Sequence, residues 1–582
     1  MSQPATDKPE LLEVSEPIQI NQPNEEPKLS SSESASHTSS SLDELALRYV
    51  DEYRQGVYYQ QRAVISPIEV DELTSKIAKL YEKVRRIVDW KEENIIRRTA
   101  IERILKRTLL SEISGIGQGA LDAEKITEPL VMEMVRSGYF SNGRVSRNKI
   151  PLAKASLAKY IYILNHSPFS TKEGSLKIKE KINFFNWILE IAACEIEEIL
   201  EPAFKENALI NFMTAYIHAR LKVYPSNQLD NETTLVQTYV AVHRALYSLD
   251  APLISYNLIK YFYPRWFEDD RDYLDHFAQN IRSVKQKVEE ALSLKSGKEF
   301  FKICERHDAP FLLLGDVMKE IENDPEGFEA KLADHSVLSP LIETVYEKRL
   351  STLKKRLYRS AVYSTLSIFV AGIASFFLFE GPIAELAGYS FSWFALFIDL
   401  AVPSALMFLL VVTIRLPQKD NLKRIQDEIT KIVSKLNETE VYEVYLIKRK
   451  NLIIQAIFSI FSMIGGVVGA YAVYMVFKVA GVPWTSIYID TVNVAMVVFA
   501  AMVIRHKALE LTVQEGGGVL TMLLDYFYLP LARLGQWFSQ KWKEYNIVSV
   551  FFSALIDSPF SMIMGLIEDW RAYLRDRRSE IH

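Results

Sequence analysis

The stretch FIDLAVPSALMFLLVVTIR, residues 397–415, is almost entirely apolar but contains Asp399. A membrane-crossing helix needs about 20 consecutive apolar residues, so this run has nearly the required length. A second run, YIDTVNVAMVVFAAMVIR at residues 488–505, follows the same pattern: Asp490 comes after an isoleucine, an apolar stretch follows it, and the run ends in Ile-Arg. The repeat predicts two equivalent pairs of helices, each with a carboxylate inside its apolar part.

Membrane spans are predicted from the apolar runs and from the charges that flank them. Four segments have the length and composition of spans, at residues 360–379, 391–414, 452–477 and 484–504. Lysine and arginine are frequent before the first segment, between the second and third, and after the fourth, whereas the other two connections hold a single lysine between them. Because basic residues concentrate in cytoplasmic loops, this distribution predicts a multi-pass protein of the cell membrane with both termini in the cytoplasm.

The carboxylates inside the predicted spans are candidates for a functional site. Ionisable side chains inside a bilayer are costly and often mark the path of an ion or a proton. Asp399 and Asp490, with Asn493 one helical turn beyond, are therefore a candidate ion or proton site. The alternative is a structural contact, because an acid one or two turns below the membrane surface can reach interfacial water or a neighbouring hydroxyl group.

The third predicted span has the features of a packing helix. Ser459, Ser462, Gly466 and Gly469 recur at spacings of three and four, which places them on one helix face. Gly465 and Gly469 also form a GxxxG motif, and small residues let neighbouring helices approach closely. The pattern predicts a tight bundle, and a pore-lining or dimer face is the alternative.

The polar half of the chain predicts a helical domain. Between residues 42 and 338 apolar residues recur at every third or fourth position, and strand signals are scarce. SPIEVDEL, from Ser66, has a serine N-cap and a proline at the first helical position, which predicts a helix start. Apolar seams of the coiled-coil type lie at residues 70–87, 274–288, 342–357 and 422–436. The predicted class is all-α: a helical cytosolic domain, a coiled-coil-like stalk and a transmembrane bundle.

The predicted organisation divides the chain into eight parts. They are a disordered tail (1–41), a helical cytosolic domain (42–338), an amphipathic stalk helix (339–359), a first transmembrane pair (360–414), a cytoplasmic coiled-coil-like connection (415–451), a second transmembrane pair (452–505), a hinge (506–518) and amphipathic interfacial helices or a hairpin with a basic C-terminus (519–582). If the two apolar segments after residue 519 crossed the bilayer, the bundle would have six spans.

Catalytic motifs are scarce in this sequence. Glu268, Asp269, Asp272 and His276 carry enough ligand atoms for a divalent cation, although acids are also favoured in the first turn of a helix. The sequence holds no HExxH, CxxC, GxSxG or kinase motif, so we expect no cofactor, and a non-enzymatic function is favoured over an enzymatic one. A net charge of −5 predicts no binding to nucleic acid.

Two functions compete, and a third is weaker. The first is a non-enzymatic membrane protein whose cytosolic domain binds or organises partners, or forms a homo-oligomer through its coiled-coil seams, at the inner face of the bilayer. The second is an ion- or proton-conducting channel or transporter that uses Asp399 and Asp490. The third is an enzyme that acts on lipid.

Overall fold

The computed structural model describes residues 42–62, 64–69, 93–114, 122–141, 143–169, 178–225, 228–268, 270–386, 388, 393–412, 414, 420–435, 440–446, 452–479, 481, 484–508, 511 and 530–537. Most of these residues are helical, which confirms the all-α class. The predicted tail, the apolar seam at 70–87 and most of the chain from 506 onward lie outside the described residues.

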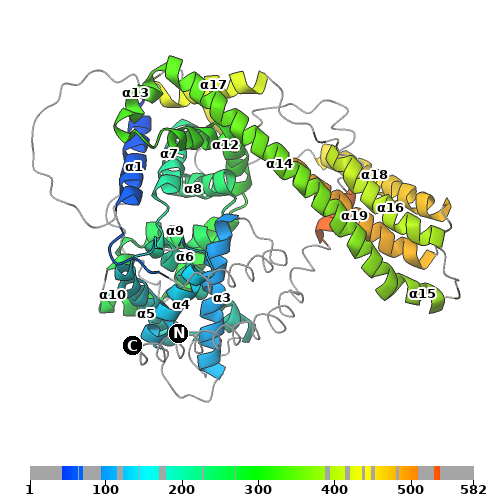
Figure 1. The fold of residues 1–582 in the computed structure, drawn as a ribbon, viewed down its shortest axis with the longest axis horizontal. Coiled ribbons are helices and arrows are strands. Elements are labelled where there is room, and N and C mark those ends of the chain that lie inside the picture. The colour runs from blue at the N-terminus through cyan, green and yellow to red at the C-terminus, as the bar shows by residue number, and fades with distance from the viewer. Residues whose placement is uncertain are drawn as a thin grey trace, which may run out of the picture.

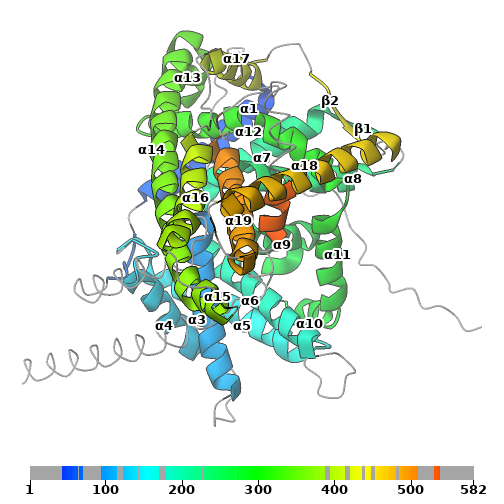
Figure 2. The same cartoon turned by 90° about the vertical axis from the view of Figure 1, so that its right-hand side faces the viewer.

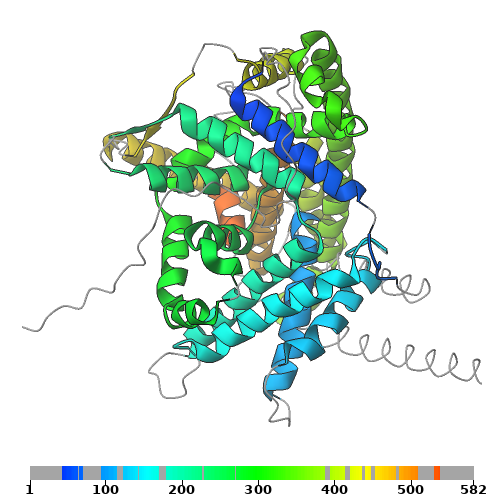
Figure 3. The same ribbon diagram turned by 90° about the vertical axis from the view of Figure 1, so that its left-hand side faces the viewer.

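The body on the left of Figure 1 is built around two hydrophobic cores that share helix α8 (Asn231–Tyr247). The lower core is formed by α3 (Glu93–Ser114), α4 (Ala123–Arg136), α5 (Ile150–His166), α6 (Ile178–Leu200), α9 (Ala251–Phe262), α10 (Arg271–Gln279) and α11 (Ile281–Ser293). The upper core is formed by α1 (Glu44–Gln61), α7 (Phe204–Arg220), α12 (Gly297–Glu320), α13 (Phe328–Ala333), the first half of α14 (His335–Ser375) and α17 (Asp420–Val433). Figure 3 shows the N-terminal helix α1, in blue, lying across this upper part. Short 3-10 turns connect some of these helices, at η1 (Arg147–Lys149), η2 (Pro264–Phe267) and η3 (Pro325–Gly327).

Local signals set several of the helix ends. The side chain of Asp270 accepts hydrogen bonds from the backbone N–H groups of Asp272 and Tyr273 at the start of α10, and Asp334 accepts one from Ser336 at the start of α14. Such caps satisfy N–H groups that have no partner within the helix. The predicted helix start at Ser66 is wrong. Ser66 has a φ of 51°, in the left-handed region, and Pro67 forms an isolated bridge with Ser146. Ile68 N donates to Val145 O at 2.9 Å, so a backbone partner from a distant segment replaces the local cap.

A short pair of parallel strands joins two distant parts of the chain. β1 (Leu221–Tyr224) pairs in register with β2 (Tyr442–Tyr445), and the two lie at the edge of the body in Figure 2. These strands were not predicted, because four residues are too few for a clear alternating pattern. The pairing makes the connection between the second and third apolar segments part of the body.

The predicted coiled-coil seams pack within the same chain where the structure describes them. Ile425, Ile429 and Ile432 of α17 are buried in the upper core, and Val284 and Val288 of α11 are buried in the lower core. An apolar stripe at helical spacing shows that one helix face is buried, but it does not identify the partner. These described seams therefore hold the body together.

Helix α14 is continuous from the body into the helical bundle on the right of Figure 1. Leu338, Ile342 and Leu353 in its first half belong to the upper core, and Ala361 in its second half belongs to the bundle. The helix is 41 residues long and passes directly into a π-helical turn, η4 (Phe376–Glu380), which is followed by α15 (Gly381–Leu386). A single rigid element thus links the body to the far end of the bundle.

The bundle consists of the second half of α14 together with α16 (Trp393–Val412), α18 (Leu452–Val479), α19 (Trp484–Ala508) and a helical segment at 530–537. The first four of these helices overlap the four apolar segments that were predicted as spans, and the segment at 530–537 does not. Met407 of α16 and Val498 of α19 are among the residues that fill its interior. Within the part of the chain that the structure describes, no helix combines the length and the apolar character needed to cross a membrane.

Glycines allow close helix contacts in the bundle. A Cβ atom on Gly466 would lie 3.0 Å from the Pro530 side chain, and one on Gly535 would lie 2.2 Å from the carbonyl oxygen of Ala495. Gly465 is buried and Gly469 is half-buried on the same helix as Gly466. Ser459 and Ser462 lie in α18, but their side chains are outside the described part. Segment 530–537 therefore packs closely against both α18 and α19.

A buried ion pair stabilises the lower core. Glu195 accepts hydrogen bonds from Lys159 Nζ at 2.8 Å, Tyr160 Oη at 2.7 Å and Trp266 Nε1 at 2.8 Å. Burial lowers the pKa of Lys159, and the nearby carboxylate of Glu195 opposes this effect. The carboxylate thus compensates a buried ammonium and two buried donors at once.

Removing this carboxylate should destabilise the body. We expect Glu195→Ala to lower the free energy of unfolding by about 3–5 kcal/mol, because it leaves a buried cation without its partner. Chemical denaturation monitored by circular dichroism measures the change. Glu289→Ala is the matched control, since the Glu289–Lys285 pair is exposed and such pairs contribute little. Equal free energies of unfolding for the two variants would contradict a stabilising role for the buried Glu195–Lys159 pair.

Candidate functional site

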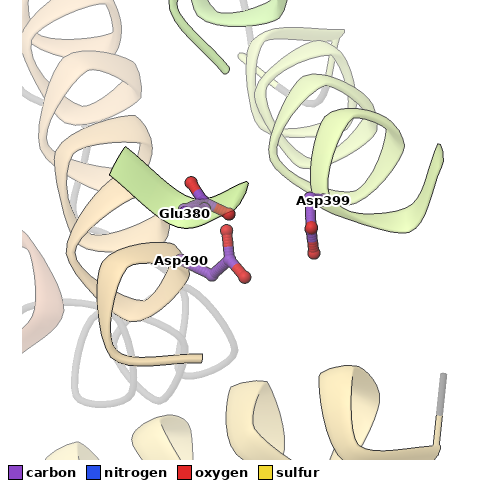
Figure 4. Close-up of side chains that lie close together, drawn as sticks. All are labelled: Glu380, Asp399 and Asp490. Carbon is purple, nitrogen blue, oxygen red and sulfur yellow. The ribbon is translucent and has the colours of Figure 1, made fainter. Parts of the chain in front are cut away.

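Three acidic side chains meet inside the bundle. Glu380 comes from the π-helical turn η4, Asp399 from α16 and Asp490 from α19. One carboxylate oxygen from each residue lies within 4.8 Å of the others. In Figure 4 the carboxyl groups of Glu380 and Asp490 point toward one another, and Asp399 lies beside them on the neighbouring helix. We call this group the acid triad.

The packing of three helices places the acid triad. Helix α16 lies between α14 and α19, and Met407, Val411 and Val497 fill the space between them. Gly372 lets α14 approach α16, since a Cβ atom there would lie 2.8 Å from Leu400 Cδ2, next to Asp399 in the sequence. The π-helical turn that follows α14 carries Glu380 at its last position, and such turns are frequent at functional sites.

The acid triad is buried and lacks a compensating partner among the described residues. The exposed fraction is 2% for Glu380, 6% for Asp399 and 1% for Asp490. Glu380 Oε1 accepts a hydrogen bond from Ser375 Oγ at 2.8 Å, and Glu380 Oε2 has no hydrogen-bond partner in the described part. The carboxyl groups of Asp399 and Asp490 have no described side-chain partner other than each other. Burying an ionised carboxylate without a partner costs roughly several kcal/mol of folding free energy. A proton or a cation that neutralises the carboxylate removes this cost. The acid triad therefore has to hold protons, a cation or both.

The ligand atoms of the acid triad are all oxygens. Carboxylate oxygens suit hard cations such as Mg²⁺, Ca²⁺ and Mn²⁺, whereas softer metals prefer imidazole or thiolate ligands. It is the one group of three acidic, histidine or cysteine residues within the described chain that could hold a metal ion. Glu380, Asp399 and Asp490 are thus the residues that could bind a cation.

The structure brings together Asp399 and Asp490, the two aspartates of the repeated sequence pattern. Asn493 is half-buried on α19, one turn beyond Asp490. Glu380 was missed, because it follows the first apolar segment directly and was included in the connection to the second. Its position at the apolar end of a predicted span was the available signal.

In the second candidate group, at Glu268–His276, the side chains of Glu268 and His276 contact other protein side chains. Arg265 Nε donates to Glu268 Oε2 at 2.7 Å, and the neighbouring Asp270 caps α10. The ring of His276 faces the side chain of Asn280, and Asp269 lies outside the described residues. The acidic residues described here surround the start of a helix, where negative charge is favourable.

No protein-family model, curated protein or solved structure matches this chain. Its function is therefore inferred from the chemistry of the acid triad and from the helices that hold it.

Neutralising one member of the acid triad should stabilise the protein when no cation is bound. In the presence of a chelator we expect Asp490→Asn to raise the free energy of unfolding by about 1–3 kcal/mol, because an unpartnered buried carboxylate is replaced by a neutral amide. Thermal unfolding of the purified protein measures this. Glu385→Gln, at an exposed position on α15, is the control. A lower melting temperature for Asp490→Asn would show that the carboxylates hold the helices together.

Proposed function

We propose that this chain is a multi-pass membrane protein that binds and moves a cation through the bundle, with the acid triad as its binding site and the helical body as its regulatory part. The observation that carries the proposal is the burial of three carboxylates without a cationic partner in the described chain. A buried acid without a protein partner is costly, so its presence in an apolar bundle favours a functional role.

The outer surface of the bundle supports the membrane part of the proposal. Large apolar side chains are exposed along its helices, namely Val362, Leu366, Phe369, Val370, Phe377, Trp393, Phe394, Phe397, Phe408, Leu409, Val412, Ile460, Met463, Ile464, Val467, Val468, Val476, Val479 and Met496. Exposed apolar patches of this extent mark a membrane or protein interface. The apolar runs at 391–414, 452–477 and 484–504 also include residues whose side chains are not described, and their full lengths suit a bilayer.

The flanking charges support a cytoplasmic position for the body. Lys348, Arg349, Lys354, Lys355, Arg356 and Arg359 lie on α14 before its apolar half. Basic residues concentrate on the cytoplasmic side of membrane proteins. With α14 oriented in this way, both ends of the chain and the connection that contains α17 face the cytoplasm, and the acid triad lies toward the opposite side.

The contacts between the body and the bundle support a regulatory role for the body. Asn421, at the start of α17, is buried, and its Nδ2 donates to Tyr346 Oη of α14 at 3.3 Å and to Leu511 O at 2.6 Å. Leu511 follows closely after α19, the helix that carries Asp490. One amide thus ties together α17, α14 and the chain leaving α19, so a movement of the body would reach two helices that position the acid triad.

We prefer transport to the organisation of protein partners because two of the apolar seams are buried within this chain and are not available to a partner. The partner hypothesis rests on coiled-coil seams, and Val284, Val288, Ile425 and Ile429 from two of them are buried in the chain's own cores. A seam that is filled by its own domain offers no surface to another helix. The acid triad, in contrast, has unused ligand atoms.

Cation flux should depend on the acid triad. We expect proteoliposomes containing the wild-type protein to take up cations down an imposed gradient, and the double variant Asp399→Asn/Asp490→Asn to lose at least about 90% of that rate, since both charges of the repeated pair are removed. Fluorescent indicators for protons and for metal cations inside the vesicles report the uptake. Glu385→Gln should match the wild type. Flux that is unchanged in the double variant would refute a transport role for these aspartates.

Membrane integration can be measured separately from flux. We expect the full chain to remain in the membrane pellet after alkaline carbonate extraction, because the exposed apolar surface of the bundle needs lipid around it. A chain that carries Ile464→Lys and Val467→Lys on the exposed face of α18 should be released or degraded. Complete extraction of the wild-type chain would refute the membrane assignment.

A further inference from the structure

We propose that the cation bound by the acid triad is a hard divalent ion of the Mn²⁺, Mg²⁺ and Ca²⁺ class, and that Glu380 is the ligand that gives the site its preference for a divalent ion. This inference rests on the proposed function and names the class of its cargo. Four features of the site support it: the spacing of the oxygens, their number, the charge they carry and the element that supplies Glu380.

The spacing of the oxygens fits a single ion. Metal–oxygen distances are about 2.0–2.1 Å for Mg²⁺ and 2.3–2.6 Å for Ca²⁺, so two ligands on opposite sides of one ion lie roughly 4–5 Å apart. One oxygen each from Glu380, Asp399 and Asp490 falls within 4.8 Å of the other two. The three side chains can therefore bind the same ion with little movement of the helices.

The number of available oxygens also fits. Glu380 Oε2 and the carboxyl groups of Asp399 and Asp490 are buried, and in the described part of the chain the two aspartates have only each other as side-chain partners. Carboxylates bind hard divalent ions through one or both oxygens, and waters complete the coordination. The donor set includes no nitrogen or sulfur, which disfavours Zn²⁺ and copper relative to Mn²⁺, Mg²⁺ and Ca²⁺.

The charge of the acid triad favours two positive charges over one. Three carboxylates in an apolar interior repel one another when they are ionised, and a monovalent ion would then leave two negative charges uncompensated. A divalent ion leaves one, next to the hydroxyl group of Ser375, which donates a hydrogen bond to Glu380. A site made of Asp399 and Asp490 alone would also neutralise a divalent ion. Such a site would offer the ion fewer oxygen ligands to replace its bound waters than the three carboxylates do.

Glu380 differs from the two aspartates in the element that carries it. Asp399 and Asp490 lie within helices of the two sequence repeats, whereas Glu380 ends the π-helical turn that continues α14 from the body. A shift of α14 along its axis would withdraw one ligand and leave two in place. The affinity of the site for the ion would then fall while Asp399 and Asp490 stay in place. Such a decrease in affinity would allow the ion to be released during transport.

Binding of Mn²⁺ to the full-length protein tests this inference. The protein, purified in detergent and stripped with a chelator, is titrated with Mn²⁺, and the loss of the free-ion signal is followed by electron paramagnetic resonance. We expect one ion per chain, displaced by Ca²⁺ or Mg²⁺ and not by about 100 mM Na⁺ or K⁺. Glu380→Gln should weaken Mn²⁺ binding by about 10- to 100-fold or more. Loss of a group that only hydrogen-bonds to a metal ligand already has an effect of this size.

Two further variants guard against a folding defect in Glu380→Gln. Ser375→Ala keeps the carboxylate but removes the hydrogen bond that orients it, so we expect a smaller, several-fold loss of Mn²⁺ affinity with an unchanged helical spectrum. Glu385→Gln, on the exposed side of α15, should bind as the wild type does. Wild-type affinity in Glu380→Gln would overturn the role of Glu380.

The outcomes separate this inference from the proposed function. If the wild type fails to bind Mn²⁺, Mg²⁺ or Ca²⁺ while its proton or Na⁺ flux is lost in Asp399→Asn/Asp490→Asn, the divalent assignment is wrong and transport stands. If Mn²⁺ binds and requires the acid triad but no cation crosses the vesicle membrane, the divalent site stands and transport is wrong.

Discussion

The repulsion among three buried carboxylates is the constraint on which the rest of the bundle depends. Glu380, Asp399 and Asp490 have no cation beside them in the described chain, so the helices that carry them must be held together by other contacts. Those contacts are apolar: Met407, Val411, Val497 and their neighbours pack between α14, α16 and α19. Packing energy thus opposes an electrostatic penalty, and a ligand that removes the penalty would tighten the whole bundle.

The body and the bundle share helix α14, and the turn that follows this helix carries one member of the acid triad. The first half of α14 is fixed in the upper core by Leu338, Ile342 and Leu353, and its far end continues into the turn that carries Glu380. A helix of 41 residues is about 60 Å long at a rise of 1.5 Å per residue, and it does not compress. The position of Glu380 relative to the two aspartates is therefore set partly by the body. The amide of Asn421 extends this control to the end of α19.

Sequence reasoning predicts the helices well and their partners poorly, for physical reasons. Periodicity reports that one face of α17 is buried, but the partner of Ile425 and Ile429 depends on tertiary packing, so an internal core helix was predicted as a coiled-coil seam. The pairing of β1 with β2 is also non-local and leaves little trace in four residues. Asp399 and Asp490 were found because acids are unusual in apolar runs. Glu380 was missed because only tertiary packing brings the turn after α14, which carries it, next to Asp399 and Asp490.

The two sequence repeats differ in the charged residue at the end of their first helix, and this difference bears on which groups could neutralise the acid triad. The two repeats contribute one aspartate each, but they differ where their first helices end: α14 leads to Glu380, which is buried, whereas α18 ends near Lys478, which is exposed. The ammonium group of Lys478 lies over the ring of Tyr474, 5.4 Å from its centroid, and the side chain of Glu380 instead turns inward toward Asp490. Lys478 is thus exposed near the end of α18, whereas Asp490 of the same repeat is buried. In the part of the chain that the structure describes, no basic side chain pairs with the acid triad, so a bound proton or a bound cation has to balance whatever charge its carboxylates carry.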